Sequence, residues 1–347
     1  MYKIFSSIMM RSSTCLLLGL IMTLISCSDK SHQLQQLLLK GNLALEKQDY
    51  QTAANYYKES LRLDACFSDA LNNLGTVAFQ TGHFAESIDW YDQAIQCSPR
   101  KDFYLNRANA HLEDGALFLA LSDADKFLSF APDTIPGLVL KSIVLMRLKK
   151  FDEAVAAMDA VLAREPDEPE WWVNRGTLYF FKGKNDLASV DLKHALSIDS
   201  NSAEAWNALS MIDAESGKTD SALFKISQAL ELQSAHPHFI NNRGYIFLLK
   251  GNLAQAEADI NKSMSLEPDN PWVYRNRALI YMEKKEFPSA ERLFRQVLSM
   301  DSSVDRINYF FAASLAAQNK KSDACQWFNR SVEKSGRYDN LLKICSR

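Results

Sequence analysis

Small residues recur along this chain every 34 positions, within a background of periodically placed apolar residues. One column is small in nine successive rows, and only the step from Ser87 to Ala120 measures 33 residues. This column reads Ala53, Ser87, Ala120, Ala154, Ala188, Ala222, Ala256, Ala290 and Ala324. Twelve residues upstream a second small column reads Gly41, Gly75, Ala108, Ser142, Gly176, Ser210, Gly244, Ala278 and Ala312. A fixed period in this range predicts a solenoid of repeated helical units.

The two small columns predict one close helix crossing in every unit. Two helices joined by a short turn approach closely only where both carry small side chains, and larger residues then fill the space around them. In the second unit Gly82 is expected to end the first helix, because glycine adopts a positive φ at little cost. Pro99 is expected to stop the second helix. The nine predicted units are 34–67, 68–100, 101–134, 135–168, 169–202, 203–236, 237–270, 271–304 and 305–338.

The pattern resembles the tetratricopeptide repeat over about nine tenths of the chain. The likeness rests on the period, the two small columns and further positions: Tyr57, Tyr91, Phe84, Phe151, Pro99, Pro132, Pro166 and Pro268. Lys149, Lys285 and Asn319 stand where the family has a turn glycine. The resemblance implies an all-α, right-handed superhelical solenoid of about nine antiparallel helix pairs. It also implies a scaffold that binds peptides or proteins, although the fold alone names no partner.

The N-terminus carries a second signal. Lys3 and Arg11 precede an apolar run of about eleven residues, 15–25, which is too short for a stable membrane span and suits a secretory signal. The run ends in Leu24-Ile-Ser-Cys27, which resembles the bacterial lipoprotein signal. That resemblance implies cleavage of residues 1–26, lipid on Cys27 and a tether over residues 27–33. An ordinary secretory signal and a membrane anchor are the alternatives.

Charge and location exclude some classes of partner. Removal of residues 1–26 takes away Lys3 and Arg11 and no acid, which moves the net charge from −3 to −5. Phosphate binding needs clustered lysine and arginine, so we expect no nucleic-acid partner. By the same resemblance, Ser28 after the lipidated cysteine favours the outer membrane of a bacterial envelope, facing the periplasm. The membrane is then a partner only through lipid on Cys27.

Besides the lipidated Cys27, four cysteines remain after the signal, and none forms a Cys-x-x-Cys pair. Export permits disulfides. Residues 339–347 read as a short capping helix, so Cys345 should pack over Cys325 in the last second helix. A disulfide between them is one reading and two separate thiols the other. A bridge between Cys66 and Cys97 is less favoured.

Arginine and aspartate occur together in three units. Arginine stands beside the small column in four first helices, and in three of them an aspartate follows sixteen residues later. A buried arginine needs a partner, so we predict structural pairs that lock first helix to second helix. They are Arg107–Asp123, Arg175–Asp191 and Arg243–Asp259. For Arg277 the same column holds Leu293, which leaves its partner open. A ligand clamp is the alternative role for these arginines.

An asparagine column lies one step from the buried face. It holds Asn73, Asn106, Asn174, Asn242 and Asn276. A carboxamide donates and accepts, so such a row could bind the main chain of a peptide without reading its side chains. The alternative is that each asparagine braces the neighbouring repeat. Helical spacing adds Tyr245 and Arg275 to the candidate groove.

Catalytic and metal-binding motifs are missing from the sequence, so we expect no enzyme, no cofactor, no metal and no small-molecule substrate. The predicted function is a non-catalytic scaffold, lipid-anchored in the bacterial envelope, that binds a peptide or helix of a partner protein in the concave groove. One alternative is a dedicated subunit of an outer-membrane assembly or secretion machine, which would use the outer faces. Another is an adaptor for a cell-wall enzyme.

Overall fold

The computed structural model describes residues 30–332 and 340–345, and all regular structure in these ranges is helical. The predicted signal over 1–26 and the lipidation site Cys27 lie outside the described residues, as do residues 28, 29, 333–339, 346 and 347. Within the described ranges, no helix is both long enough and apolar enough to cross a membrane.

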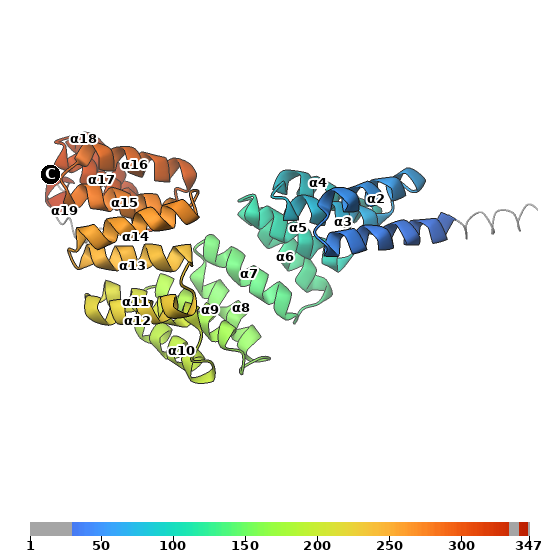
Figure 1. Cartoon of the computed structure of the whole chain (residues 1–347), viewed down its shortest axis with the longest axis horizontal. Helices are drawn as coiled ribbons and strands as arrows, with labels where there is room; N and C mark the ends of the chain where they lie inside the picture. The colour runs from blue at the N-terminus through green and yellow to red at the C-terminus, as the bar shows by residue number, and fades with distance from the viewer. Residues whose placement is uncertain (1–29, 333–339, 346–347) are drawn as a thin grey trace, which may run out of the picture. The chain divides into compact units, whose positions relative to one another are not determined.

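The chain forms two compact units, residues 1–164 and 165–347, each built from successive helix pairs (Figure 1). Unit 1 contains a helix over residues 30–46, then α2 (Tyr50–Leu63), α3 (Ser68–Gln80), α4 (Phe84–Cys97), α5 (Lys101–Glu113), α6 (Leu117–Phe130), α7 (Ile135–Arg147) and α8 (Phe151–Leu162). Unit 2 contains α9 (Pro169–Phe181), α10 (Asn185–Ile198), α11 (Ala203–Glu215), α12 (Thr219–Leu232), α13 (Pro237–Leu249), α14 (Leu253–Leu266), α15 (Pro271–Glu283), α16 (Phe287–Met300), α17 (Ile307–Ala317), α18 (Lys321–Arg330) and α19 (Asn340–Cys345).

Small residues bring the two helices of a pair into close contact. In the pair α3 and α4, a methyl group on Gly75 would lie 2.6 Å from the ring of Tyr91. Ser87 on α4 is fully buried and donates from Oγ to the carbonyl of Gly75 at 2.7 Å. The small columns therefore mark the helix crossing, where a larger side chain would push the helices apart.

The turns inside the pairs use a left-handed residue whether or not it is glycine. Gly82 has a φ of 77°, as expected for a glycine that ends a helix. Lys149, Lys285 and Asn319 replace that glycine and still adopt φ values of 59°, 62° and 63°. Because a left-handed residue other than glycine is disfavoured, packing of the two helices imposes this conformation on the turn.

Each repeat continues into the next through its first helix. The first helices of neighbouring repeats contact one another, α3 with α5 and α5 with α7 in unit 1, and α11 with α13 and α13 with α15 in unit 2. We call the surface that these helices share within one unit its first-helix face. This face carries the predicted groove residues.

Helix α19 covers the end of the last pair in unit 2. Leu341 is buried within a cluster that includes Phe311 and Phe328. Such a cap shields the apolar side of a terminal repeat, which has no following neighbour to cover it.

Candidate interaction face

The arginines beside the small column hold the two helices of their pairs together. Arg107 donates from Nε and Nη2 to the two carboxylate oxygens of Asp123, at 2.7 and 2.6 Å. Arg175 makes the same bidentate contact with Asp191. A carboxylate facing a guanidinium in this way gives a strong charge-assisted pair, which suits a structural role better than a ligand clamp.

Arg243 and Arg277 occupy the same position of the repeat but bind different partners. Arg243 contacts Asp259 at 2.7 and 2.8 Å, and this hydrogen-bonded carboxylate raises the pKa of Arg243. Arg277, whose column offers no acid, donates to the sulfur of Met264 on the preceding second helix at 3.2 Å. The partner of Arg277, which the sequence had left open, is therefore the Met264 sulfur, a weak hydrogen-bond acceptor.

One ion pair in unit 2 runs in the reverse direction. Lys225 on α12 stands in the column that holds aspartate elsewhere, and it contacts Asp213 on α11. Ser221 donates to the same carboxylate at 2.6 Å. These contacts lower the pKa of Asp213 against the opposing effect of its burial. Sequence reasoning missed this pair, since it looked for aspartate only on the second helix.

Four asparagines of unit 1 form a continuous chain of hydrogen bonds on its first-helix face. Asn106 donates to Asn72 at 2.9 Å, Asn72 donates to Asn73 at 3.1 Å, and Asn73 donates to Asn42 at 2.8 Å. The Asn42 oxygen also accepts from the hydroxyl of Tyr57 at 2.8 Å. We call these four asparagines the amide relay. All four are half-buried, and the relay crosses three repeats without a charged group.

Unit 2 repeats the bracing contact in separate pairs. Asn242 donates to Asn207 at 2.8 Å, and Asn276 donates to Asn241 at 2.9 Å. In each pair the acceptor is the residue one place before the asparagine column in the preceding repeat. Asn174 is half-buried and makes no side-chain hydrogen bond to the described residues of its own unit. The asparagine column therefore does brace neighbouring repeats at most of its positions.

Arg275 lies in an aromatic enclosure that we call the arginine cage. Its guanidinium carbon is 5.2 Å from the ring centre of Tyr245, 4.7 Å from Trp272 and 5.9 Å from Phe310. The guanidinium donates to the side-chain oxygen of Asn276 at 3.1 and 2.9 Å. Burial of the guanidinium lowers the pKa of Arg275.

The arginine cage changes the status of two predicted groove residues. Arg275 is 5% exposed and Tyr245 is 9% exposed, so neither offers its side chain to a partner. The helical spacing placed both on the first-helix face, but the aromatic side chains of neighbouring repeats cover the arginine and stack on it. Asn276, at 1% exposure, is buried with them.

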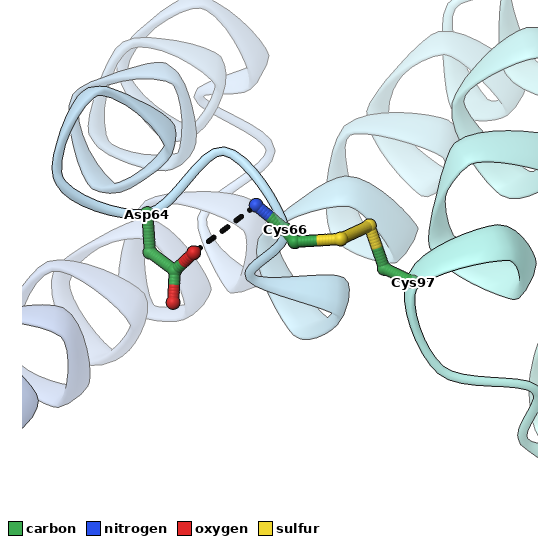
Figure 2. The surroundings of a disulfide bond; sticks show 3 residues. All are labelled: Asp64, Cys66 and Cys97. Carbon is green, nitrogen blue, oxygen red and sulfur yellow. Dashed lines mark hydrogen bonds between the residues drawn. A yellow bond between two sulfur atoms is a disulfide. The ribbon is translucent and has the colours of Figure 1, made fainter.

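Among the residues that the structure describes, one disulfide lies in each unit. Cys325 is joined to Cys345, with 5.3 Å between their Cα atoms, which ties α18 to α19. Cys66 is joined to Cys97, with 5.4 Å between their Cα atoms (Figure 2). The sequence favoured the Cys325–Cys345 bond over the Cys66–Cys97 bond. The proximity of the turn before α3 to the end of α4 is apparent only in the structure.

His236 and His238 stand at the start of α13 in unit 2. His236 stacks on Phe239 with 3.9 Å between ring centres, and His238 lies 3.2 Å from Glu267. Among the residues that the structure describes, no group of three metal-ligating side chains comes together.

Paired helices at a 34-residue period define this chain as an α-helical repeat protein. One model described as tetratricopeptide repeat matches residues 38–102, 140–192 and 275–339, and a second matches 237–270. The first model alone covers more than half of the chain. The chain therefore belongs to the tetratricopeptide repeat family.

Curated relatives share parts of the array. Stress-induced-phosphoprotein 1 of Caenorhabditis elegans is 29% identical over 171 residues, which are 47% of this chain and 51% of the relative. The Hsp70-Hsp90 organizing protein of Triticum aestivum is 26% identical over 175 residues, 49% of this chain and 28% of the relative. Sperm-associated antigen 1 of Rattus norvegicus is 32% identical over 93 residues, 27% of this chain and 10% of the relative. The chain thus spans about half or less of these relatives.

Solved structures show the same fold. A tetratricopeptide repeat protein from Parabacteroides merdae superimposes with a TM-score of 0.60 at 18% identity, covering 72% of this chain and 98% of that one. The APC/C hetero-tetramer Cut9-Hcn1 gives a TM-score of 0.55 at 13% identity, covering 89% of this chain and 76% of that one. At these identities the likeness concerns the fold alone.

Proposed function

We propose that this chain is a non-catalytic scaffold that captures an extended segment of a partner protein on the first-helix face of unit 1. The observation that carries the proposal is the amide relay, which is half-buried and crosses three repeats. Each relay nitrogen uses one of its two hydrogens within the relay or none, so every asparagine keeps an N–H for a ligand. Such donors suit the carbonyl groups of an extended main chain.

The predicted groove residues fall into two groups, those that are half-buried and those that are buried. Asn73 and Asn106 belong to the amide relay, while Asn174 and Asn242 are half-buried on the first-helix face of unit 2. Asn73 and Asn106 are the proposed contacts on unit 1, and Asn174 and Asn242 are candidate contacts of unit 2 taken by itself. Asn276, Tyr245 and Arg275 are buried and support the face from within.

Similarity to adaptor proteins supports the proposed scaffold function. The wheat relative is named for organising Hsp70 and Hsp90. We infer a comparable role for this chain, which is to hold a partner without transforming it. The relay itself contains no lysine or arginine, so the captured segment should be uncharged where it crosses the relay.

The location of the scaffold is a separate proposal. The signal-like segment before Cys27 supports a lipid-anchored protein of the bacterial envelope, and Ser28 after that cysteine favours the periplasmic side of the outer membrane. Metabolic labelling with a radioactive fatty acid tests this. Label should enter the wild type and be lost in Cys27→Ser.

A second candidate function uses the second helices. On α10 and α12 in unit 2, Leu187, Val190 and Phe224 are 49%, 64% and 61% exposed. Large apolar residues on the solvent side of a second helix favour a dedicated subunit of an assembly or secretion machine, or an adaptor for a cell-wall enzyme.

The deciding experiment is crosslinking and pull-down from membranes with the lipidated chain. Asn72→Ala with Asn106→Ala should abolish capture, because it removes two relay carboxamides that are only half-buried. Asn241→Ala in unit 2 is the matched control and should capture as the wild type does.

The outcomes separate the candidates. Loss of capture only in Val190→Ser with Phe224→Ser would favour the second-helix face and overturn the relay proposal. Recovery of no partner by the wild type under several growth states would count against the scaffold itself.

A further inference from the structure

The disulfide in unit 1 joins the points where the chain enters two relay-bearing helices. Cys66 stands two residues before α3 begins, and Cys97 is the last residue of α4, just before the short turn into α5. Figure 2 shows the bond closing the gap between these segments, with the Cys66 amide donating to the Asp64 carboxylate at 3.2 Å. The bridge therefore links the entry of α3 to the entry of α5.

The same two helices carry most of the amide relay. Asn72 and Asn73 lie on α3 and Asn106 lies on α5, where the contact from Asn106 to Asn72 measures 2.9 Å. A hydrogen bond weakens steeply once donor and acceptor separate by more than a few tenths of an ångström. The relay thus depends on a fixed spacing between α3 and α5.

Other side-chain contacts also hold these helix entries together. Leu71 on α3 and Phe103 on α5 share a buried cluster with Ala94 of α4. Arg100, which precedes α5, pairs with Asp69 in the first turn of α3. Their side chains are 48% and 37% exposed, and exposed pairs contribute little to stability in water. The disulfide is the covalent restraint among these contacts, and it is stronger than the exposed ion pair.

We propose that the Cys66–Cys97 disulfide is a redox-sensitive positioning element for the amide relay, so that its reduction weakens partner binding. The proposal rests on the proposed function of the relay. A dithiol reductant opens the bond by thiolate attack on one sulfur. Closure of the reductant into its cyclic disulfide then releases both cysteines, each having gained one electron and one proton.

The second disulfide provides a matched control within the same chain. The Cys325–Cys345 bond closes a segment of comparable length, 20 residues apart against 31, and ties α18 to α19 in unit 2. Both of its cysteines belong to unit 2, whereas the amide relay belongs to unit 1. Loss of either bond frees the unfolded chain to a similar degree, so a general loss of stability should appear in both variants.

The test compares full-length Cys66→Ser with Cys97→Ser against Cys325→Ser with Cys345→Ser. The probe is an immobilised set of capped ten-residue peptides of uncharged residues. Removal of one well-placed hydrogen bond corresponds to about a tenfold loss of affinity. We expect at least that loss in the first variant and in reduced wild type, with no further effect of reductant on the first variant. The control variant should bind as the oxidised wild type does and remain sensitive to reductant.

A second readout needs no partner. Hydrogen exchange of the side-chain amides of Asn72, Asn73 and Asn106, followed by NMR well below the unfolding temperature, should accelerate in Cys66→Ser with Cys97→Ser and stay unchanged in the control. Equal exchange in both variants would overturn the positioning role. If exchange accelerates but Asn72→Ala with Asn106→Ala binds the peptides normally, the positioning role stands and the proposed function of the relay fails.

Discussion

The first-helix faces of the two units are built from the same columns of the repeat, but they differ in how deeply the residues of those columns are buried. In unit 1 the columns hold asparagines that are half-buried and bonded in a neutral chain. In unit 2 the same columns reach Arg275, which is buried among aromatic rings and bonded to Asn276. One column can therefore line a solvated surface in some repeats and belong to the core in others.

The difference follows from the neighbouring side chains. Arg275 is preceded one helical turn earlier by Trp272 and faces Tyr245 and Phe310 from the adjacent first helices. At the corresponding place in unit 1, the side chain of Asn72 is half-buried and bonded to the side chains of Asn73 and Asn106. Large aromatic rings exclude water from a charge, whereas small amides leave it access.

The largest expected effect concerns the arginine cage. Arg275→Ala should destabilise unit 2 by about 2–4 kcal/mol, because it leaves a cavity among the rings and removes the cation that they enclose. Arg275→Met keeps the volume without a buried charge and should cost less than about 1 kcal/mol. Urea unfolding followed by tryptophan fluorescence measures both.

The matched change in unit 1 is Asn72→Ala, at the same column position. It should cost about 1 kcal/mol or less, since water can replace part of a half-buried hydrogen bond. Equal costs for Arg275→Ala and Asn72→Ala would remove the distinction between a core position and a surface position.

A smaller effect is expected at the turns, which are alike in both units. Lys285→Gly should stabilise unit 2 by up to about 1 kcal/mol, because glycine relieves the left-handed strain at a φ of 62° while adding freedom to the unfolded chain. Lys149→Gly should do the same in unit 1. A thermal melt of each variant measures the gain, and a loss in either would show that the lysine contributes a contact of its own.

The smallest expected effect is a pH dependence of unit 1. Burial lowers the pKa of His111, against the attraction of Asp123, and the Nδ1 atom of His111 is buried without a hydrogen bond to the described residues. In the unfolded chain histidine titrates near pH 6.5. Below about that pH the unfolded state takes up a proton that the folded state resists, so unit 1 should lose stability as the solution becomes more acidic.

Hydrogen exchange of α5 between pH 7 and pH 5 measures this dependence. His111→Leu should flatten it. His236→Leu, which removes a histidine whose pKa is likewise lowered by burial in unit 2, should leave the exchange of α5 unchanged. An unaltered slope in His111→Leu would show that another group of unit 1 causes the effect.

Much of the fold was predictable because the same pattern recurs in nine repeats, so that a position seen in one repeat can be checked in the others. Small residues at a fixed period indicate close helix crossings, and the contact of Ser87 with Gly75 shows one such crossing in atomic detail. The turn at Lys285 was less obvious, because sequence propensity argues against a left-handed lysine. The helix pair closes there regardless, since packing of the flanking helices outweighs a local cost of about 1–2 kcal/mol.

The candidate site was predictable only in part. The asparagine column was visible in the sequence, but its acceptors Asn42, Asn72, Asn207 and Asn241 were not considered, because none of them stands in the column itself. An asparagine one place before the column in the preceding row would have been the signal for three of them. The bridge between Cys66 and Cys97 was the less favoured of two sequence-based hypotheses, and the structure contains it.

By itself, the sequence determined the helix pairs, the family and the positions where asparagine and arginine face a neighbouring helix. These follow from local periodicity, which the backbone geometry of a helix converts directly into faces. Only the tertiary structure decided which of these positions are exposed and which belong to the core. That depends on how far side chains from adjacent repeats cover a given position, and coverage is a property of three or four helices together rather than of one.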